Sequence, residues 1–569
     1  MSSPTDPARR AQLPRTIDVH VSVPESEWLP DYRAVMLIAC VISLIGFMHF
    51  ARLGQLLLYG DAVAHMNIAR RVVDSRTPGL LQLGTVWLPL PHLLMLPFIW
   101  STELWSNGVA GSIPSMVAFI ISVGGIFRLV GTGLRQLPNF AGESRFVAWF
   151  AALAYALNPN LLYLQATAMT EVIYLACYIW ATVYLSDFAI DLQKADDGHA
   201  RRALMLCGMW LCLGALTRYD GWFAATIYAI VALCLLIAAN RRNGLGAMHF
   251  LHDQGWRRAA GGFVLLLIVT PVIWFTYNQL EFGDPLSFMR GPYSAHAIEQ
   301  RSSKPGDAHH PGWDAPQVGG VYFVKSAELN VASSSRTERI WLYAGLLGAV
   351  MTIGFIRPLW TWLLLWIPVP FYAISMAWGG VPIFIPTWWP FSYYNVRYGT
   401  QLIPAFVVFG SLLVYLFLRK FSWNQAKYAT AVLAMGFVFW SYFSVWRTEP
   451  ISLKEAQVNS VDRIAIEKQL AIEIEQLPPD STILMYLGEH GGALQRIGFP
   501  LRRTINEGNY RYWQSALMDP ARMADYVIAT DGDPVAQAIK ARPQGLQELT
   551  VVSALRQNPI RIYRSTMHQ

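Results

Sequence analysis

Asp61 is the first residue of the chain whose type and position suggest chemistry. It follows the first long apolar run in the stretch Tyr59-Gly60-Asp61. A carboxylate so near a membrane-spanning segment carries a free-energy cost, so it is expected to face water or to have a functional role. Residues 62–75 repeat apolar side chains at helical spacing, which predicts an amphipathic helix lying along a membrane surface. Asp61 is therefore a base, able to accept a proton, or an ordinary N-cap of that helix, and the two roles are compatible.

Other polar residues with possible chemistry lie at the ends of apolar runs. Glu171 opens one run, as a second functional carboxylate or as an acid favoured by the helix dipole. Arg397 and Tyr398 precede another run, where they would hold an anion or anchor the chain at the membrane interface. The further candidates for contacting a substrate are His65, Arg70, Trp87, His92, Arg218, Arg290 and Lys325. Together the set offers a base, a second carboxylate and arginines able to hold a phosphate.

The composition is that of a polytopic membrane protein. Of the 569 residues, 54% are hydrophobic and only 14% are charged, and the mean hydropathy is +0.32. The net charge of +7 does not indicate nucleic-acid binding, because the basic residues cluster in short loops between apolar runs. The five cysteines all lie in apolar stretches without the spacing of a zinc site, so we expect them to serve packing.

The apolar runs predict about eleven membrane-spanning helices, since a span needs roughly 20 apolar residues. The runs are 33–58, 109–131, 147–164, 172–190, 204–219, 222–239, 261–280, 340–356, 359–378, 400–418 and 425–445. Residues 88–104 are also apolar but short and interrupted by three prolines, which favours a partial or re-entrant segment. Counting them as a full span would move most loop arginines to the outside, against the positive-inside rule.

This count divides the chain into three parts. Residues 1–32 are polar and without a cleavable signal, and are expected to form a cytoplasmic tail. Residues 33–446 would form the membrane domain of a multi-pass protein of the cell (plasma or inner) membrane, with outer loops at 59–105 and 281–339. Residues 447–569 are charged and predict a small soluble α/β domain outside the membrane. Its expected elements are a helix at 455–476 and strands at 482–487, 526–530, 549–553 and 560–563.

The first outer loop resembles that of GT-C glycosyltransferases. Tyr59-Gly60-Asp61, an amphipathic helix and a Trp/Pro-rich turn are similar to the glycosyltransferase family 39-like branch, which holds protein O-mannosyltransferases and the aminoarabinose lipid A transferase. Further matching points are Glu171, the stretch 282–286, and Arg397-Tyr398 ahead of Pro404. The resemblance implies a GT-C type α-helical fold and a polyprenyl-phosphate sugar donor used at the extracytoplasmic face. It also implies that Asp61 is a catalytic base or a metal-linked residue.

The mechanism implied by the resemblance is an inverting displacement at the anomeric carbon of a hexosyl or pentosyl donor. Asp61 would deprotonate the acceptor, and Arg397, Arg218 or Lys325 would neutralise the leaving phosphate. The sequence departs from many relatives in that Ala62 follows Asp61 where they have Asp-Glu. A divalent metal, which prefers several oxygen ligands, is therefore less expected but stays open. The acceptor is equally open among glycan, lipid and protein.

Two other classes of protein fit the same apolar runs. A transporter or flippase of lipid-linked sugars would explain the spans and charges, but transporters usually show internal repeats and polar residues at mid-membrane. The chain has no evident repeat, and its polar candidates collect at one face. An envelope assembly scaffold would use the outer domain to recruit a partner. Replacing Asp61 would distinguish an enzyme from these two classes. An enzyme would lose turnover and largely keep donor binding, whereas a scaffold would be unaffected.

Overall fold

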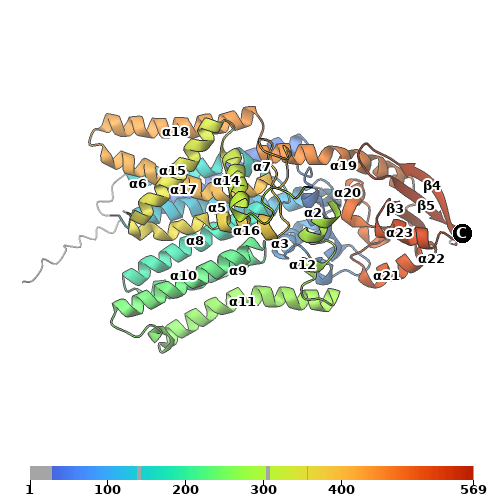
Figure 1. Ribbon diagram of the computed structural model, residues 1–569, viewed down its shortest axis with the longest axis horizontal. Helices are drawn as coiled ribbons and strands as arrows, with labels where there is room; N and C mark the ends of the chain where they lie inside the picture. Colours follow the sequence, from blue (N-terminus) through green and yellow to red (C-terminus); the bar gives the residue numbers. More distant parts are fainter. Residues whose placement is uncertain (1–27, 138–142, 303–307, 355, 568–569) are drawn as a thin grey trace, which may run out of the picture.

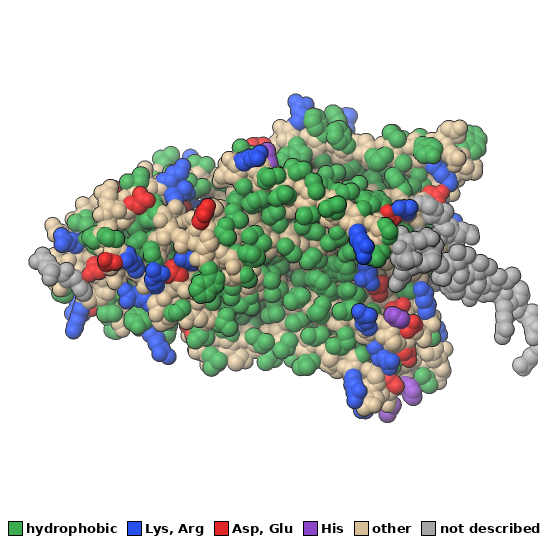
Figure 2. All heavy atoms as spheres, turned by 180° about the vertical axis from the view of Figure 1, so that it is seen from behind, with side chains coloured by type: hydrophobic (Ala, Val, Ile, Leu, Met, Phe, Trp, Pro, Cys, Tyr) green, Lys and Arg blue, Asp and Glu red, His purple; other side chains and the backbone are tan. Residues whose placement is uncertain are grey.

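The molecule is elongated, with a bundle of helices at one end and a small sheet at the other (Figure 1). The computed structural model describes residues 28–137, 143–302, 308–354 and 356–567. Nearly all of the predicted cytoplasmic tail, residues 1–27, lies outside the described residues. Hydrophobic side chains cover the middle of the molecule, and Lys and Arg side chains lie on both sides of this surface (Figure 2).

Helices form at all eleven predicted apolar runs. They are α1 (Leu29–Arg52), α5 (Val109–Leu134), α6 (Glu143–Ala156) with α7 (Pro159–Leu164), α8 (Glu171–Gln193), α9 (Asp197–Ala215), α10 (Asp220–Arg242), α11 (Gln254–Phe282), α15 (Ser335–Gly354), η4 (Arg357–Trp366) with α16 (Pro368–Trp378), α17 (Ile403–Lys420) and α18 (Asn424–Arg447). Among the described residues, eight helices are long and apolar enough to cross a membrane. The chain is therefore a multi-pass α-helical membrane protein, as its composition predicted.

The run 147–164 differs from its prediction, because it is not one continuous helix. The side chain of Asn158 accepts hydrogen bonds from the backbone N–H groups of Asn160 and Leu161, and Pro159 occupies the first turn of α7. An Asn cap followed by a proline starts a new helix and ends the one before it. The carboxamides of Asn158 and Asn160 both donate to the carbonyl of Asn330, which fixes this break inside the bundle.

The segment 88–104 forms only short helices. They are α3 (Leu90–Ile99) and α4 (Thr102–Ser106), preceded by the turn η2 (Leu80–Gln82). The ten residues of α3 span about 15 Å, whereas the hydrocarbon core is about 30 Å thick. The structure thus agrees with a partial segment, while the parity of the spans stays a prediction.

The amphipathic helix α2 (Gly60–Val73) lies deeper than predicted. Ten of its fourteen residues are buried, among them Asn67, Arg70 and Arg71. It contacts α3 on one side and α20 (Leu487–Arg496) of the C-terminal part on another. The polar face that we expected to meet water is therefore covered in part by residues 99–105, which hold Arg70, and in part by the C-terminal part, where Glu507 lies 3.8 Å from Arg71.

The long outer loop contains more helix than its composition suggested. Its helices are α12 (Ser287–Arg290), α13 (Ala295–Ser302) and α14 (Pro316–Val331). The last of them packs against α16 and against η5 (Val396–Leu402), the short helix that carries Arg397.

The C-terminal part is a long helix followed by a mixed sheet with small helices. The elements are α19 (Ile451–Glu475), β1 (Ile483–Met485), α20, η6 (Leu501–Arg503), β2 (Thr504–Ile505), α21 (Tyr510–Met518), α22 (Pro520–Met523), β3 (Tyr526–Thr530), α23 (Pro534–Ala541), β4 (Leu546–Val552) and β5 (Ile560–Ser565). The strand order is β2-β1-β3-β5-β4, in which β2, β1 and β3 are parallel and β5 is antiparallel to both neighbours. The sequence predicted the helix and four of the strands. Strand β2 was not predicted, because it has only two residues.

Ion pairs and hydrogen bonds join the C-terminal part to the first outer loop. Arg502 pairs with Asp74 at 3.1 Å, and the Gln495 carboxamide donates to the Trp105 carbonyl at 2.7 Å. Arg463 on α19 donates to the carbonyls of Leu57 and Leu58, just before α2. This part of the chain is therefore in a position to shape the outer face of the bundle.

The predicted topology leads to a labelling pattern in intact cells. Cysteines introduced at the exposed positions Ser335 and Val461 should react with an impermeant maleimide, because both would lie outside the membrane. A cysteine at exposed Asn243 should react only after permeabilisation. The unmodified protein gives the background from its own cysteines, and labelling of Asn243→Cys in intact cells would overturn the orientation.

Candidate functional site

The candidate site is a network of charged side chains at one end of the bundle. Its members come from segments far apart in sequence: Asp61 from the first turn of α2, Glu171 from the start of α8, Arg218 from the α9–α10 turn, Arg397 from η5, and Glu455 from α19. The network therefore exists only when the ends of several helices and the C-terminal part meet.

Arg397 is the centre of this network and contacts three carboxylates. Its Nη2 lies 2.6 Å from Asp61 Oδ2, its Nε 3.2 Å from Glu171 Oε1, and its Nη1 2.6 Å from Glu455 Oε1. The side chains of Glu171 and Glu455 are 1% exposed and that of Arg397 is 7% exposed, whereas Asp61 is 42% exposed. Asp61 is thus the carboxylate of this set that outside molecules can reach.

A second arginine, Arg218, extends the network toward the bundle. It pairs with Glu171 and with Asp220, both at 3.1 Å, and donates to the Thr170 hydroxyl. Asp220 also accepts hydrogen bonds from Gln401 at 2.6 Å and from the Tyr372 hydroxyl at 3.1 Å. These bonds fix Arg218 on the side away from solvent.

Two aromatic rings cover the guanidinium groups. The ring of Tyr398 lies 4.8 Å from the Arg218 guanidinium and 5.0 Å from that of Arg397. The ring of Tyr59 lies 4.8 Å from Arg397, and its hydroxyl donates to the Ser452 carbonyl. Cation–π contacts at these distances favour the charged arginines and restrict their orientation.

The network contains more acidic than basic groups. Four carboxylates, those of Asp61, Glu171, Asp220 and Glu455, form ion pairs with two guanidinium groups, those of Arg218 and Arg397. Within the described ranges, no group of three or more His, Cys, Asp or Glu side chains is arranged to hold a metal ion. The arrangement can accept a proton at its exposed carboxylate, Asp61, and can offer guanidinium hydrogens to an anion beside it.

The structure argues against Asp61 as the N-cap of α2. The residue at the N-cap of α2 is Tyr59, and no side chain caps the helix there. The Asp61 carboxylate lies in the first turn and is bonded to Arg397 instead. The N-cap interpretation is therefore wrong. Arg397 is likewise buried among carboxylates rather than placed as an interface anchor.

The buried residues His65 and His92 form a cluster with the half-buried Trp87 beside the arginines. His65 Nδ1 lies 2.9 Å from His92 Nε2, and the rings of His65 and Trp87 are 4.7 Å apart. Burial, together with the charges of Arg218 and Arg397, lowers the pKa of His65 to about 3. Burial also lowers the pKa of His92 well below its usual value, and the neighbouring His65 adds to this. Both imidazoles are therefore neutral at physiological pH.

The neutral histidines predict an acid-sensitive fold. The pKa of His65 is about 3 in the folded protein and about 6.5 when unfolded, so the unfolded chain binds more protons between these values. Stability is therefore lost as the pH falls below 6.5, by about 2 kcal/mol at pH 5. The thermal midpoint of the wild type in detergent should drop more steeply from pH 7 to pH 5 than that of His65→Gln. Substitution of exposed His252 provides the control, and equal slopes would contradict the assignment.

Three predicted residues are not brought into the network. Arg70 pairs with Asp74 at 3.0 Å, donates to the carbonyls of Ile99 and Trp100 and covers a tryptophan ring, so it ties α2 to the following segment. Lys325 pairs with Glu328 at 3.1 Å and with Glu338. Arg290 is exposed and, among the described residues, forms no ion pair.

Three members of the site were not predicted, namely Glu455, Tyr372 and Gln401. Glu455 is one of several acids on a charged helix, and nothing in its local sequence separates it from them. Tyr372 lies inside an apolar run, where a tyrosine does not by itself indicate a functional role. Gln401 lies four residues after Arg397, about one helical turn, and this spacing was the only available signal.

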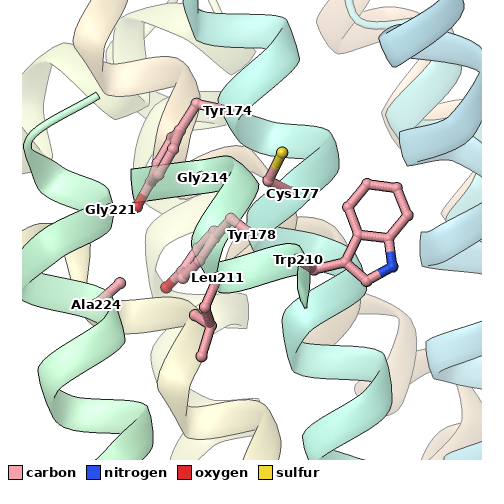
Figure 3. A pocket seen from close by; sticks show the side chains of 8 residues that line it. All are labelled: Tyr174, Cys177, Tyr178, Trp210, Leu211, Gly214, Gly221 and Ala224. Carbon is pink, nitrogen blue, oxygen red and sulfur yellow. The ribbon is translucent and has the colours of Figure 1, made fainter. Parts of the chain in front are cut away.

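A small apolar gap lies inside the bundle, between α8, α9 and α10 (Figure 3). It is lined by Tyr174, Cys177, Tyr178, Trp210, Leu211, Gly214, Gly221 and Ala224, from α8, α9 and α10. None of these side chains is charged, so the gap offers no cation to neutralise a phosphate.

Comparison with known proteins identifies the fold. No protein-family model and no curated protein matches the sequence. Among solved structures, ArnT from Cupriavidus metallidurans bound to undecaprenyl phosphate has a TM-score of 0.52 at 12% identity, over 95% of this chain and 98% of that chain. The archaeal oligosaccharyltransferase AglB from Archaeoglobus fulgidus, solved with an inhibitory peptide and a dolichol-phosphate, has a TM-score of 0.44 at 10% identity, over 88% of this chain and 69% of that chain.

The similarity to ArnT extends over nearly the whole length of both chains, from the membrane bundle to the C-terminal sheet. At 12% identity it is a similarity of fold. The chain therefore shares the fold of ArnT, in line with the resemblance of its first outer loop to GT-C glycosyltransferases.

Proposed function

We propose that the protein is a membrane glycosyltransferase. It moves a sugar from a polyprenyl-phosphate-linked donor to an acceptor at the extracytoplasmic face, with Asp61 as base. The observation that carries the proposal is the partly exposed Asp61 carboxylate, bonded to a buried arginine at the end of the bundle. The GT-C fold supports it, because the similar ArnT structure holds undecaprenyl phosphate.

In the proposed reaction Asp61 takes the proton of an acceptor hydroxyl or amine. The acceptor oxygen or nitrogen then forms a bond to the anomeric carbon, and the bond from that carbon to the phosphate oxygen breaks. The electron pair leaves with the polyprenyl phosphate, which needs no protonation to depart, and the configuration at the anomeric carbon is inverted. The 42% exposure of Asp61 is consistent with an acceptor reaching it from outside.

Arg397 and Arg218 are the candidates for neutralising the leaving phosphate. Lys325 is less suited to this role, because Glu328 and Glu338 already hold it. A phosphate next to Arg397 would compete with Asp61 for Nη2, which frees that carboxylate to face the acceptor. Glu171 and Glu455 keep the guanidinium in place during the exchange.

The donor and acceptor would come from different sides of the site. The polyprenyl tail is a membrane lipid and would enter between the spans, while the acceptor would come from outside. Glycan, lipid and protein acceptors all carry suitable groups.

The direct test incubates purified protein with polyprenyl-phosphate hexoses and pentoses, one donor at a time. A glycosyltransferase releases free polyprenyl phosphate and adds the mass of one sugar to the acceptor. Reconstitution in vesicles distinguishes the alternatives. Movement of an intact donor across the bilayer without sugar transfer would show a flippase, and the absence of both activities with every donor would favour a scaffold.

A further inference from the structure

The end of the bundle opposite the candidate site carries a basic recess. It is lined by Arg201, Arg202, Met205, Gly255, Arg258 and Ala259. These residues belong to the first turns of α9 and α11, whereas Arg218 follows the other end of α9. The 19 residues of α9 place the two sites on the order of 28 Å apart, close to the thickness of a bilayer.

The arginines of the recess are only partly neutralised. Arg201 lies 3.5 Å from Asp253 and 5.8 Å from the Trp256 ring. Arg202 and Arg258 are exposed, and neither forms an ion pair in the part of the chain that the structure describes. The recess therefore has excess positive charge, and its guanidinium groups suit a phosphate.

Gly255 makes room for the Arg201 guanidinium. A Cβ atom at this position would lie 2.1 Å from Arg201 Nη1. The guanidinium thus rests directly on the backbone of α11, beside Arg258. Any side chain at residue 255 would push Arg201 out of this position.

An apolar strip continues from the recess along α11. Gly261, Leu265 and Ile268 follow Arg258 at helical spacing and share its face. Leu265 is 65% and Ile268 52% exposed, and a Cβ at Gly261 would meet nothing within 4 Å. In Figure 1, α11 lies at the edge of the bundle, and in Figure 2 Lys and Arg side chains gather at this end beside the hydrophobic surface. A charged head at the arginines and a chain along this strip would fit together.

We propose that this recess binds the phosphate group of an anionic membrane lipid, at the membrane surface opposite the candidate site. The lipid bridges the first turns of α9 and α11, with its acyl chain along Gly261 and Leu265. Arg202 and Arg258 hold the phosphate, and Arg201, seated on Gly255, completes the set.

The test measures retention of dioleoyl phosphatidic acid by native mass spectrometry of the full-length protein. The double variant Arg202→Gln/Arg258→Gln should lose affinity by about 30-fold, since each basic contact at a membrane surface contributes about fivefold. The matched control is Arg241→Gln/Arg257→Gln, which removes two exposed arginines that do not line the recess. Equal losses in the two double variants would overturn the site, because they would show a general effect of surface charge.

A third variant, Gly255→Ala, keeps every charge but displaces Arg201. It should weaken lipid retention without lowering the thermal midpoint, and unchanged retention would contradict the assigned geometry.

Inorganic phosphate and dioleoyl phosphatidylcholine complete the experiment. If inorganic phosphate competes as well as the lipid at equal concentration, the apolar strip plays no part and the lipid assignment is wrong. Equal retention of phosphatidylcholine would show that the negative charge is not recognised.

Discussion

Asp61→Asn should reduce turnover by at least a hundredfold while leaving the protein folded. In the wild type, Arg397 Nη2 lies 2.6 Å from Asp61 Oδ2. The amide oxygen of the variant can still accept this hydrogen bond. An amide cannot accept a proton at neutral pH, however, and general-base catalysis contributes about 10²–10⁴-fold in rate. The ion pair itself is partly exposed, so its loss should change stability by no more than about 1 kcal/mol.

The measurement pairs product formation with the thermal midpoint and with donor binding. Glu103→Gln is the matched control, because it removes an exposed carboxylate from the same outer loop and should be fully active. Near-normal product formation by Asp61→Asn would end the case for Asp61 as base. An unfolded variant is recognised from its thermal midpoint and would show that the ion pair is structural.

Glu455→Gln should be the most damaging conservative change in the network. Glu455 Oε1 accepts hydrogen bonds from the Asn395 backbone N–H and from Arg397 Nη1, and Oε2 accepts from the Arg397 backbone N–H. A glutamine must place its NH₂ group against one of these donors. Breaking a buried ion pair by removing one partner costs about 3–5 kcal/mol. We therefore expect a large loss of stability and, because Arg397 is released, reduced turnover.

Turnover is compared well below the unfolding midpoint, so that the two effects are separated. Glu475→Gln on the same helix is exposed and should change neither quantity. A destabilised Glu455→Gln enzyme with normal turnover would show that Glu455 holds the fold without positioning Arg397. Unchanged stability would contradict the buried geometry.

The elements that could be predicted are those encoded in local sequence. A membrane helix is a run of some 20 apolar residues, so each predicted run is helical in the structure. The short α3 was evident from its prolines, and β1, β3, β4 and β5 from short apolar runs between turns. Asp61, Glu171, Arg218 and Arg397 were found because a charge at the end of an apolar run is conspicuous.

The local sequence does not determine which carboxylates each basic residue pairs with. Arg397, Arg70 and Lys325 looked alike as candidate phosphate ligands, yet they meet different carboxylates: Asp61, Glu171 and Glu455 for the first, Asp74 for the second, Glu328 and Glu338 for the third. Coulomb energy depends on separation and on the surrounding dielectric, and neither can be read from residue types. Glu455 joins Arg397 only because α19 packs against η5 at the end of the bundle that carries the network. The chain order thus supplies the helices and the charges, while the packing of distant segments determines which of these charges lie within bonding distance.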